Sequence, residues 1–155
     1  MLYQLWAANT AISLSFGNFR RGEALGTRHG EGVTVSRHRS NTLCAEFLSA
    51  ASSALSAEKD ELIHKQVLDT ALGQASIVQN ANSTLVLEGT FQMVVDLLQD
   101  IASNGVSRIA NVDKINNVRC PRVLPAIDAY FAAAARQVKK GPQVLATFPK
   151  ACRKG

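Results

Sequence analysis

Apolar residues recur every three or four positions along most of the chain after Ser40, and this spacing constrains the fold more than any other feature. Such a period places the apolar side chains on one face of an α-helix. Clusters of polar residues, glycine and proline interrupt the pattern and divide it into five expected helices, at 41–55, 57–79, 84–103, 106–119 and 123–140. We therefore predict an all-α fold, an antiparallel helical bundle of about five helices. No run of 18 apolar residues occurs, so no transmembrane segment is expected.

Local signals predict where these helices end. Ser56 is typical of an N-cap, so we expect one helix to end and the next to begin there. The polar residues at 79–83 predict a loop, and Gly105 predicts a helix end because glycine accepts the left-handed backbone conformation. Pro121 and Pro125 favour a boundary before the last helix, since proline is disfavoured inside a helix.

The same period predicts which side chains point inward. Charged residues around His64 are expected to face solvent, and so is Arg119 in the fourth helix. The inward stripe expected for the helix at 57–79 consists of Ile63, Val67, Ala71, Ala75 and Val78.

The first 40 residues differ from the rest, and we interpret 1–40 as a poorly ordered leader and 41–155 as the bundle domain. Residues 1–16 have the length of a signal-peptide core but lack a basic start. The five arginines within 1–41, among several serines and threonines, are typical of a mitochondrial transit peptide instead. The leader is therefore predicted to be a removable targeting sequence of one of these two kinds.

Basic residues are concentrated in the last third of the chain, where ten Lys or Arg stand against two Asp between 106 and 155. Such a concentration can mark a surface for an anionic partner. A nucleic-acid surface would also interleave aromatic residues, and only Phe148 is near, so we do not expect nucleic-acid binding. We interpret the basic patch as cations at a helix end followed by a solvated tail. Its members are Arg136, Lys139, Lys140, Lys150, Arg153 and Lys154.

The three cysteines leave two alternatives open. Cys44, Cys120 and Cys152 form no C-x-x-C pair, and none has a histidine at metal-ligand spacing. In a secreted protein, these candidates would supply one disulfide and a spare thiol, or an intermolecular bridge. In a reducing compartment all three would serve as small apolar residues.

Residues that could carry catalysis or bind a metal are few. Glu61 and His64 have the E-x-x-H spacing that places both on one helix face, but neither a second copy nor an H-E-x-x-H motif occurs. Asp96 and Asp100 are four residues apart on the polar face of their helix, where we expect them to be solvated. No nucleophile or phosphate-binding motif is found. We therefore predict a protein that is not an enzyme, with no catalytic residue, no metal and no cofactor.

Asn82 begins an Asn-Ser-Thr sequon for N-glycosylation in the loop predicted at 79–83. With the amphipathic helices, it favours a secreted, disulfide-containing glycoprotein that acts by binding an apolar small molecule between its helices or a protein partner. The candidate ligand-binding residues are apolar positions from the main helices: Phe47, Val67, Phe91, Leu98, Ile127 and Phe131. The alternative hypothesis is a small accessory subunit of a mitochondrial complex, with 1–40 as a cleaved transit peptide and the opposed charge blocks docking into the assembly.

Overall fold

The computed structural model describes residues 33–73, 75–138 and 150–152, and these residues form helices and no strand. The predicted all-α class is therefore confirmed. None of the helices in these ranges has the combination of length and apolar character needed to cross a membrane. The elements in chain order are α2 (Val33–Leu72), α3 (Ser76–Asn82), the π-helical turn η1 (Ser83–Leu87), α4 (Thr90–Asn104), the 3₁₀ turn η2 (Gly105–Arg108), α5 (Ala110–Val118), the π-helical turn η3 (Arg119–Val123), α6 (Leu124–Val138) and the 3₁₀ turn η4 (Lys150–Cys152).

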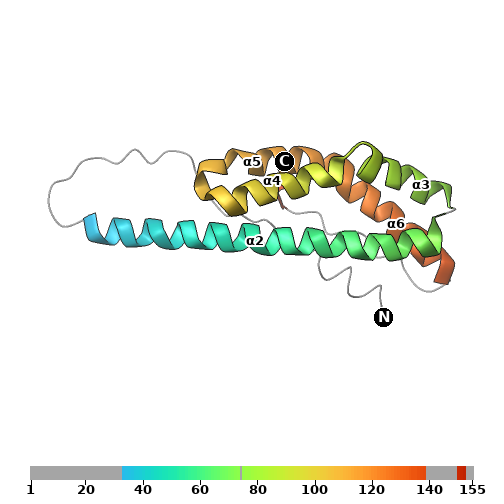
Figure 1. The fold of residues 1–155 in the computed structure, drawn as a ribbon, viewed down its shortest axis with the longest axis horizontal. Coiled ribbons are helices and arrows are strands. Elements are labelled where there is room, and N and C mark those ends of the chain that lie inside the picture. The colour runs from blue at the N-terminus through green and yellow to red at the C-terminus, as the bar shows by residue number, and fades with distance from the viewer. Residues whose placement is uncertain (1–32, 74, 139–149, 153–155) are drawn as a thin grey trace.

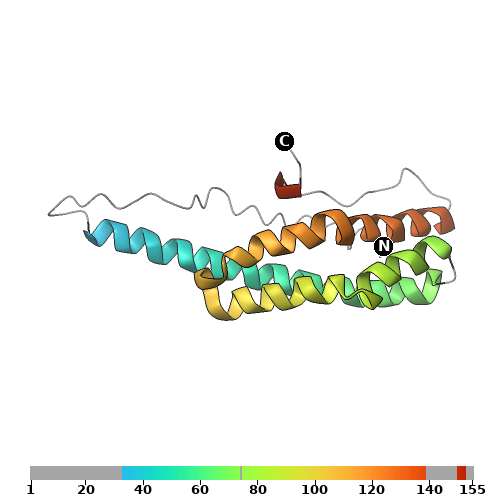
Figure 2. The ribbon, with the colours of Figure 1, turned by 90° about the horizontal axis from the view of Figure 1, so that it is seen from above.

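In the described part of the chain these elements build a three-helix bundle, not the predicted bundle of about five helices. α2 alone is the first helix; α3, η1 and α4 follow one another along the second, and α5, η3 and α6 along the third (Figure 1). Consecutive helices run antiparallel, with α2 packed on α4, α4 on α5, and α3 on α6. The amino-terminal part of α2 extends beyond the ends of α4 and α5 in both views (Figures 1 and 2).

The helix boundary predicted at Ser56 is wrong, because α2 runs through this residue without a break. Neither glycine nor proline lies nearby, and a serine that is not needed as a cap is tolerated inside a helix. α2 also begins at Val33, so that 33–40 are helical although the sequence analysis placed them in the leader. Residues 1–32 lie outside the described part of the chain.

Proline and glycine act differently in this fold. The boundary expected at Pro121 and Pro125 is absent, because Pro121 lies in η3 and Pro125 in the first turn of α6. A π-helical turn changes the local hydrogen-bond pattern, so the helix can continue past the missing proline N–H. By contrast, Gly105 ends α4 as predicted, with a φ of 63°, and Gly89 separates η1 from α4 with a φ of 67°.

The apolar core lies between the three helices. On α2, the small residues Ala51 and Ala54 are buried and permit close approach of the neighbouring helix. The largest apolar or aromatic side chains that are fully buried come from the second and third helices: Leu98, Ile101, Ile115, Leu124, Ile127, Tyr130 and Phe131.

The predicted inward stripe is wrong at Ile63 and Val67, which are 58% and 46% exposed, and at Ala71, which is also exposed. Because α2 is one continuous helix, its rotation is fixed by Phe47, Ala51 and Leu55, which pack into the core. Continuing their three- to four-residue period along a rigid helix leads to charged residues rather than to Ile63. The buried charged side chains on this face of α2 are Glu58, Glu61 and Lys65.

Candidate functional site

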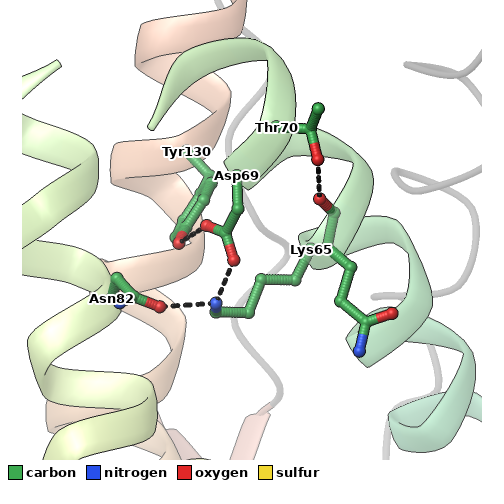
Figure 3. Close-up of polar contacts among 6 residues, drawn as sticks. Lys65, Asp69, Thr70, Asn82 and Tyr130 are labelled. Atoms are coloured by element: carbon green, nitrogen blue, oxygen red, sulfur yellow. Dashed lines mark hydrogen bonds and ion pairs between the residues drawn. The ribbon is translucent and has the colours of Figure 1, made fainter. Parts of the chain in front are cut away.

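Near the carboxyl end of α2, a buried lysine lies at the centre of a polar network (Figure 3). Lys65 is 6% exposed, and its Nζ donates to Asp69 Oδ2 at 2.5 Å and to Asn82 Oδ1 at 2.6 Å. The Tyr130 hydroxyl donates to the other oxygen of Asp69 at 2.5 Å, and Lys65 Nζ lies 5.6 Å from the centroid of the Tyr130 ring. The network therefore joins α2, α3 and α6 through paired charges and hydrogen bonds.

The positive charge of the buried lysine is compensated within this network. A buried ammonium group is stable only when it is paired and hydrogen-bonded, and Asp69 and Asn82 meet both conditions. Burial, together with the hydrogen bond to Asp69 and its charge, raises the pKa of Tyr130, so the phenol stays protonated and acts as a donor. The arrangement fixes side chains on three elements.

Asp69 also lines a cavity of about 330 Å³ where the ends of α2 and α6 meet the start of α3. Its apolar wall includes Leu72, Ile77 and Ala133. The polar residues of the lining are Asp69, Thr70, Arg136 and Gln137, and the remaining members are Ala71, Gly73 and Ala75. The cavity therefore combines an apolar wall with a few polar groups, as small-molecule sites commonly do.

Arg136 is the one member of the predicted basic patch whose side chain lies in the described part of the chain, and it is exposed. Among the described residues it has no ion pair. Lys150 lies in η4, but its side chain is not described. The other members, Lys139, Lys140, Arg153 and Lys154, lie outside the described residues.

Most of the six candidate ligand-binding residues belong to the packed core. Five of them, Phe47, Phe91, Leu98, Ile127 and Phe131, are buried members of the packed core, whereas Val67 is exposed on the outside of α2. None of the six lines the cavity at Asp69, and none lines a second cavity of about 320 Å³ between α3, η3 and α6. Ligand binding by these six residues stays a prediction.

Two buried carboxylates and a buried arginine form a second polar cluster, which the sequence analysis missed. Arg119 Nε lies 3.1 Å from Glu58 Oε1, and both side chains are buried. Glu61 is 2% exposed, and neither its Oε2 nor Oε2 of Glu58 has a hydrogen-bond partner among the described atoms. The expectation that Arg119 faces solvent is wrong, because its side chain is buried. Of the charged residues around His64, which is itself half-buried, Glu61 and Lys65 are buried and only Asp60 is exposed as expected.

The two glutamates of this cluster have unusual protonation. Desolvation raises the pKa of Glu61 to about 8, and the neighbouring charge of Glu58 acts in the same direction. Burial also raises the pKa of Glu58, although Arg119 acts in the opposite direction. Glu61 is therefore mostly protonated at neutral pH, and Glu58 is the carboxyl group that faces the guanidinium of Arg119. Within the described ranges, no group of three or more His, Cys, Asp or Glu residues could hold a metal ion.

Asp96 is exposed on α4, as predicted, but Asp100 is half-buried. Oδ2 of Asp100 accepts from Asn111 at 2.8 Å and pairs with Arg108 at 3.2 Å. These contacts join α4 to η2 and α5, so Asp100 holds these elements together.

Cys120 and Cys152 form a disulfide, with their Cα atoms 5.3 Å apart. Of the two alternatives for the cysteines, this is the pairing with one disulfide and one spare thiol. The spare thiol belongs to Cys44, which is half-buried on α2. Cys152 packs against the core, so the bond attaches η4 to the junction between α5 and α6.

Asn82 is the last residue of α3 and is followed directly by η1, so the loop predicted at 79–83 is absent. The Asn82 side chain is half-buried and accepts the hydrogen bond from Lys65. Glycosylation of the sequon stays a prediction, and the side chain that would carry the glycan belongs to the polar network.

No family model matches the chain, and no curated protein or solved structure shows significant similarity to it.

Proposed function

We propose that this chain is a non-enzymatic, secreted binding protein, and that it takes a small amphipathic anion in the cavity bounded by α2, α3 and α6. The observation that carries the proposal is the charge balance at the cavity. Asp69 is neutralised by Lys65 and held by Tyr130, whereas Arg136 lines the same cavity with no ion pair among the described residues. A carboxylate is the natural partner for a planar guanidinium that is otherwise unpaired.

The size and apolar wall of the cavity favour an aliphatic ligand of moderate length. At about 30 Å³ for each water-sized group, the 330 Å³ cavity would accommodate about eleven non-hydrogen atoms. Leu72, Ile77 and Ala133 offer the surface on which an alkyl chain would pack. A medium-chain carboxylate such as octanoate combines this size with a negative charge that complements Arg136.

The disulfide supports the secreted location, because disulfides persist in oxidising compartments and are rare in reducing ones. The intact mass of the natural protein, measured before and after reduction, tests this part of the proposal. A closed disulfide with glycan mass at Asn82 is the expected result. An unglycosylated chain with three reduced thiols, recovered in a large mitochondrial complex, would favour the accessory-subunit alternative instead.

Calorimetric titration of the full chain with octanoate and with octan-1-ol tests the ligand site. Octanoate should bind at least about ten-fold more tightly, because only the acid forms a charge-assisted contact with Arg136. Arg136→Gln should remove this preference, and Ala71→Leu, at an exposed position that lines the cavity, should weaken both ligands. Lys114→Gln on the exposed face of α5 is the matched control and should change neither affinity. Equal binding of acid and alcohol, or no binding of either, would overturn the proposal.

A further inference from the structure

In the polar network, the side-chain nitrogen of Lys65 lies against the side-chain amide of Asn82 (Figure 3). Lys65 Nζ is 2.6 Å from Asn82 Oδ1, and a carbonyl bond is about 1.23 Å long, so Nζ lies within about 3.8 Å of the amide carbon Cγ. Reacting atoms in a near-attack arrangement are about 3–3.5 Å apart. A small shift of either side chain would therefore bring the amine of Lys65 into position to attack this amide.

Asp69 is placed to move the protons that such a reaction requires. Its Oδ2 accepts from Lys65 Nζ at 2.5 Å, so the carboxylate can take a proton from the ammonium group and leave a nucleophilic amine. The hydroxyl of Tyr130 donates to the other oxygen of Asp69 at 2.5 Å and fixes the orientation of the carboxylate. Lys65 is 6% exposed, so little water reaches the reacting nitrogen.

We propose that Lys65 and Asn82 join through a covalent isopeptide bond, which forms in the folded chain when Asn82 carries no glycan, with Asp69 as the proton carrier. Asp69 takes one proton from the ammonium group, and the electron pair of Nζ then attacks Cγ of Asn82. The bond between Cγ and Nδ2 breaks as Nδ2 receives the proton held by Asp69 and a second proton from Nζ, and Nδ2 leaves as an ammonium ion. The product is a secondary amide with one hydrogen on Nζ, and Asp69 is again a carboxylate.

The fold supplies the proximity that a free lysine and a free asparagine lack. α2 carries the amine and the proton carrier, α3 carries the amide, and Tyr130 of α6 holds the proton carrier in place. Two groups held in this way react as if one of them were present at an effective concentration of about 10⁵ M or more. Lys59 and Asn80 are exposed residues of the same two helices, and we expect them to stay unmodified.

The cross-link and a glycan on Asn82 exclude each other, because both need the same nitrogen. Glycosylation attaches the sugar to Nδ2, whereas the cross-link expels Nδ2. A glycosylated chain keeps the ammonium group of Lys65, and with it the charge balance at the cavity on which the proposed function depends. The proposed function and the cross-link are therefore tested on different forms of the protein.

The intact mass of the full chain, produced in a host that adds no glycan, tests the cross-link. After reduction of the disulfide, the wild-type chain should be lighter than its sequence predicts by the mass of one ammonia molecule. Proteolytic digestion should release a branched peptide in which Lys65 is joined to Asn82. Lys65→Arg should keep the full mass, because a guanidinium stays protonated and cannot attack. The matched controls, Lys59→Arg and Asn80→Ser, should lose ammonia as the wild-type chain does.

The roles of Lys65 and Asp69 separate this reaction from other losses of ammonia. An asparagine that cyclises onto its own backbone also loses ammonia, but that reaction needs neither side chain. Asp69→Asn should slow cross-linking at least about 100-fold, since a positioned proton carrier contributes about this much, and circular dichroism shows whether the variant is folded. A wild-type chain that keeps its full mass after prolonged incubation at neutral pH would overturn the proposal, and so would an equal loss of ammonia in Lys65→Arg.

Discussion

The protonation of Glu61 leads to a quantitative prediction about how stability depends on pH. The carboxyl group is buried beside Glu58, and its pKa rises from 4.5 to about 8 on folding. Between these two values the folded state binds more protons than the unfolded state, so stability falls as pH rises. This pKa difference corresponds to about 5 kcal/mol of unfolding free energy, at about 1.4 kcal/mol per pH unit. About half of that stabilisation is lost between pH 5 and pH 7.

Glu61→Gln isolates this effect, because glutamine keeps the shape of the protonated acid and cannot ionise. The variant should be within about 1 kcal/mol of the wild-type chain at pH 5 and exceed its stability by about 4 kcal/mol at pH 8. Urea denaturation followed by circular dichroism at pH 5, 6, 7 and 8 measures the free energy of unfolding at each point. Any dependence of the unfolding free energy on pH that persists in the variant is attributed to Glu58, whose pKa is also raised.

The matched control is Asp96→Asn, which removes an acid from the exposed face of α4. This change should leave the pH profile of the wild-type chain unaltered. If Glu61→Gln and the wild-type chain lose stability in parallel from pH 5 to pH 8, then Glu61 does not hold its proton in the folded state. The burial argument for the second polar cluster would then be refuted.

Three further predictions concern the contacts that hold the bundle together. Tyr130→Phe should cost about 1 kcal/mol of unfolding free energy, measured in urea, because the aspartate of the polar network loses one donor. Arg119→Met should cost about 3–5 kcal/mol at pH 7 by leaving Glu58 buried without its cation, and adding Glu58→Gln should recover most of the loss. Reduction of the bond between Cys120 and Cys152, 32 residues apart, should cost about 4 kcal/mol, and a melting temperature unaffected by reductant would contradict this value.

The helices with strong local signals could be predicted from the sequence. The apolar stripe of α4 and the glycine that follows it predicted a helix end at Ser103, one residue before the end at Asn104 in the structure. Five expected helices became three because Ser56 and the prolines are compatible with either a boundary or a continuation. Which alternative occurs depends on packing against the neighbouring helices, which a local signal does not contain.

The polar network around Lys65 was not predicted, because the residues that α2 buries depend on the rotation of this helix about its axis. Treating 57–79 as a separate helix allowed its most apolar face, with Ile63 and Val67, to point inward. In the continuous helix the rotation is set upstream by Ala51, and Lys65 then lies on the buried face. The charged residues from Glu58 to Asp69 repeat with the same three- to four-residue period as a core stripe, and this was the signal available in the sequence.

The disulfide also determines how the chain would respond to a protease. Cys120 lies before α6 and Cys152 lies after it, so the covalent loop contains the whole of that helix. A single cut anywhere inside the loop would leave both fragments joined, and the nicked molecule would gain only the mass of one water. The fragments would separate only after reduction, so a nicked preparation would run as intact protein on a non-reducing gel and as two shorter chains on a reducing one.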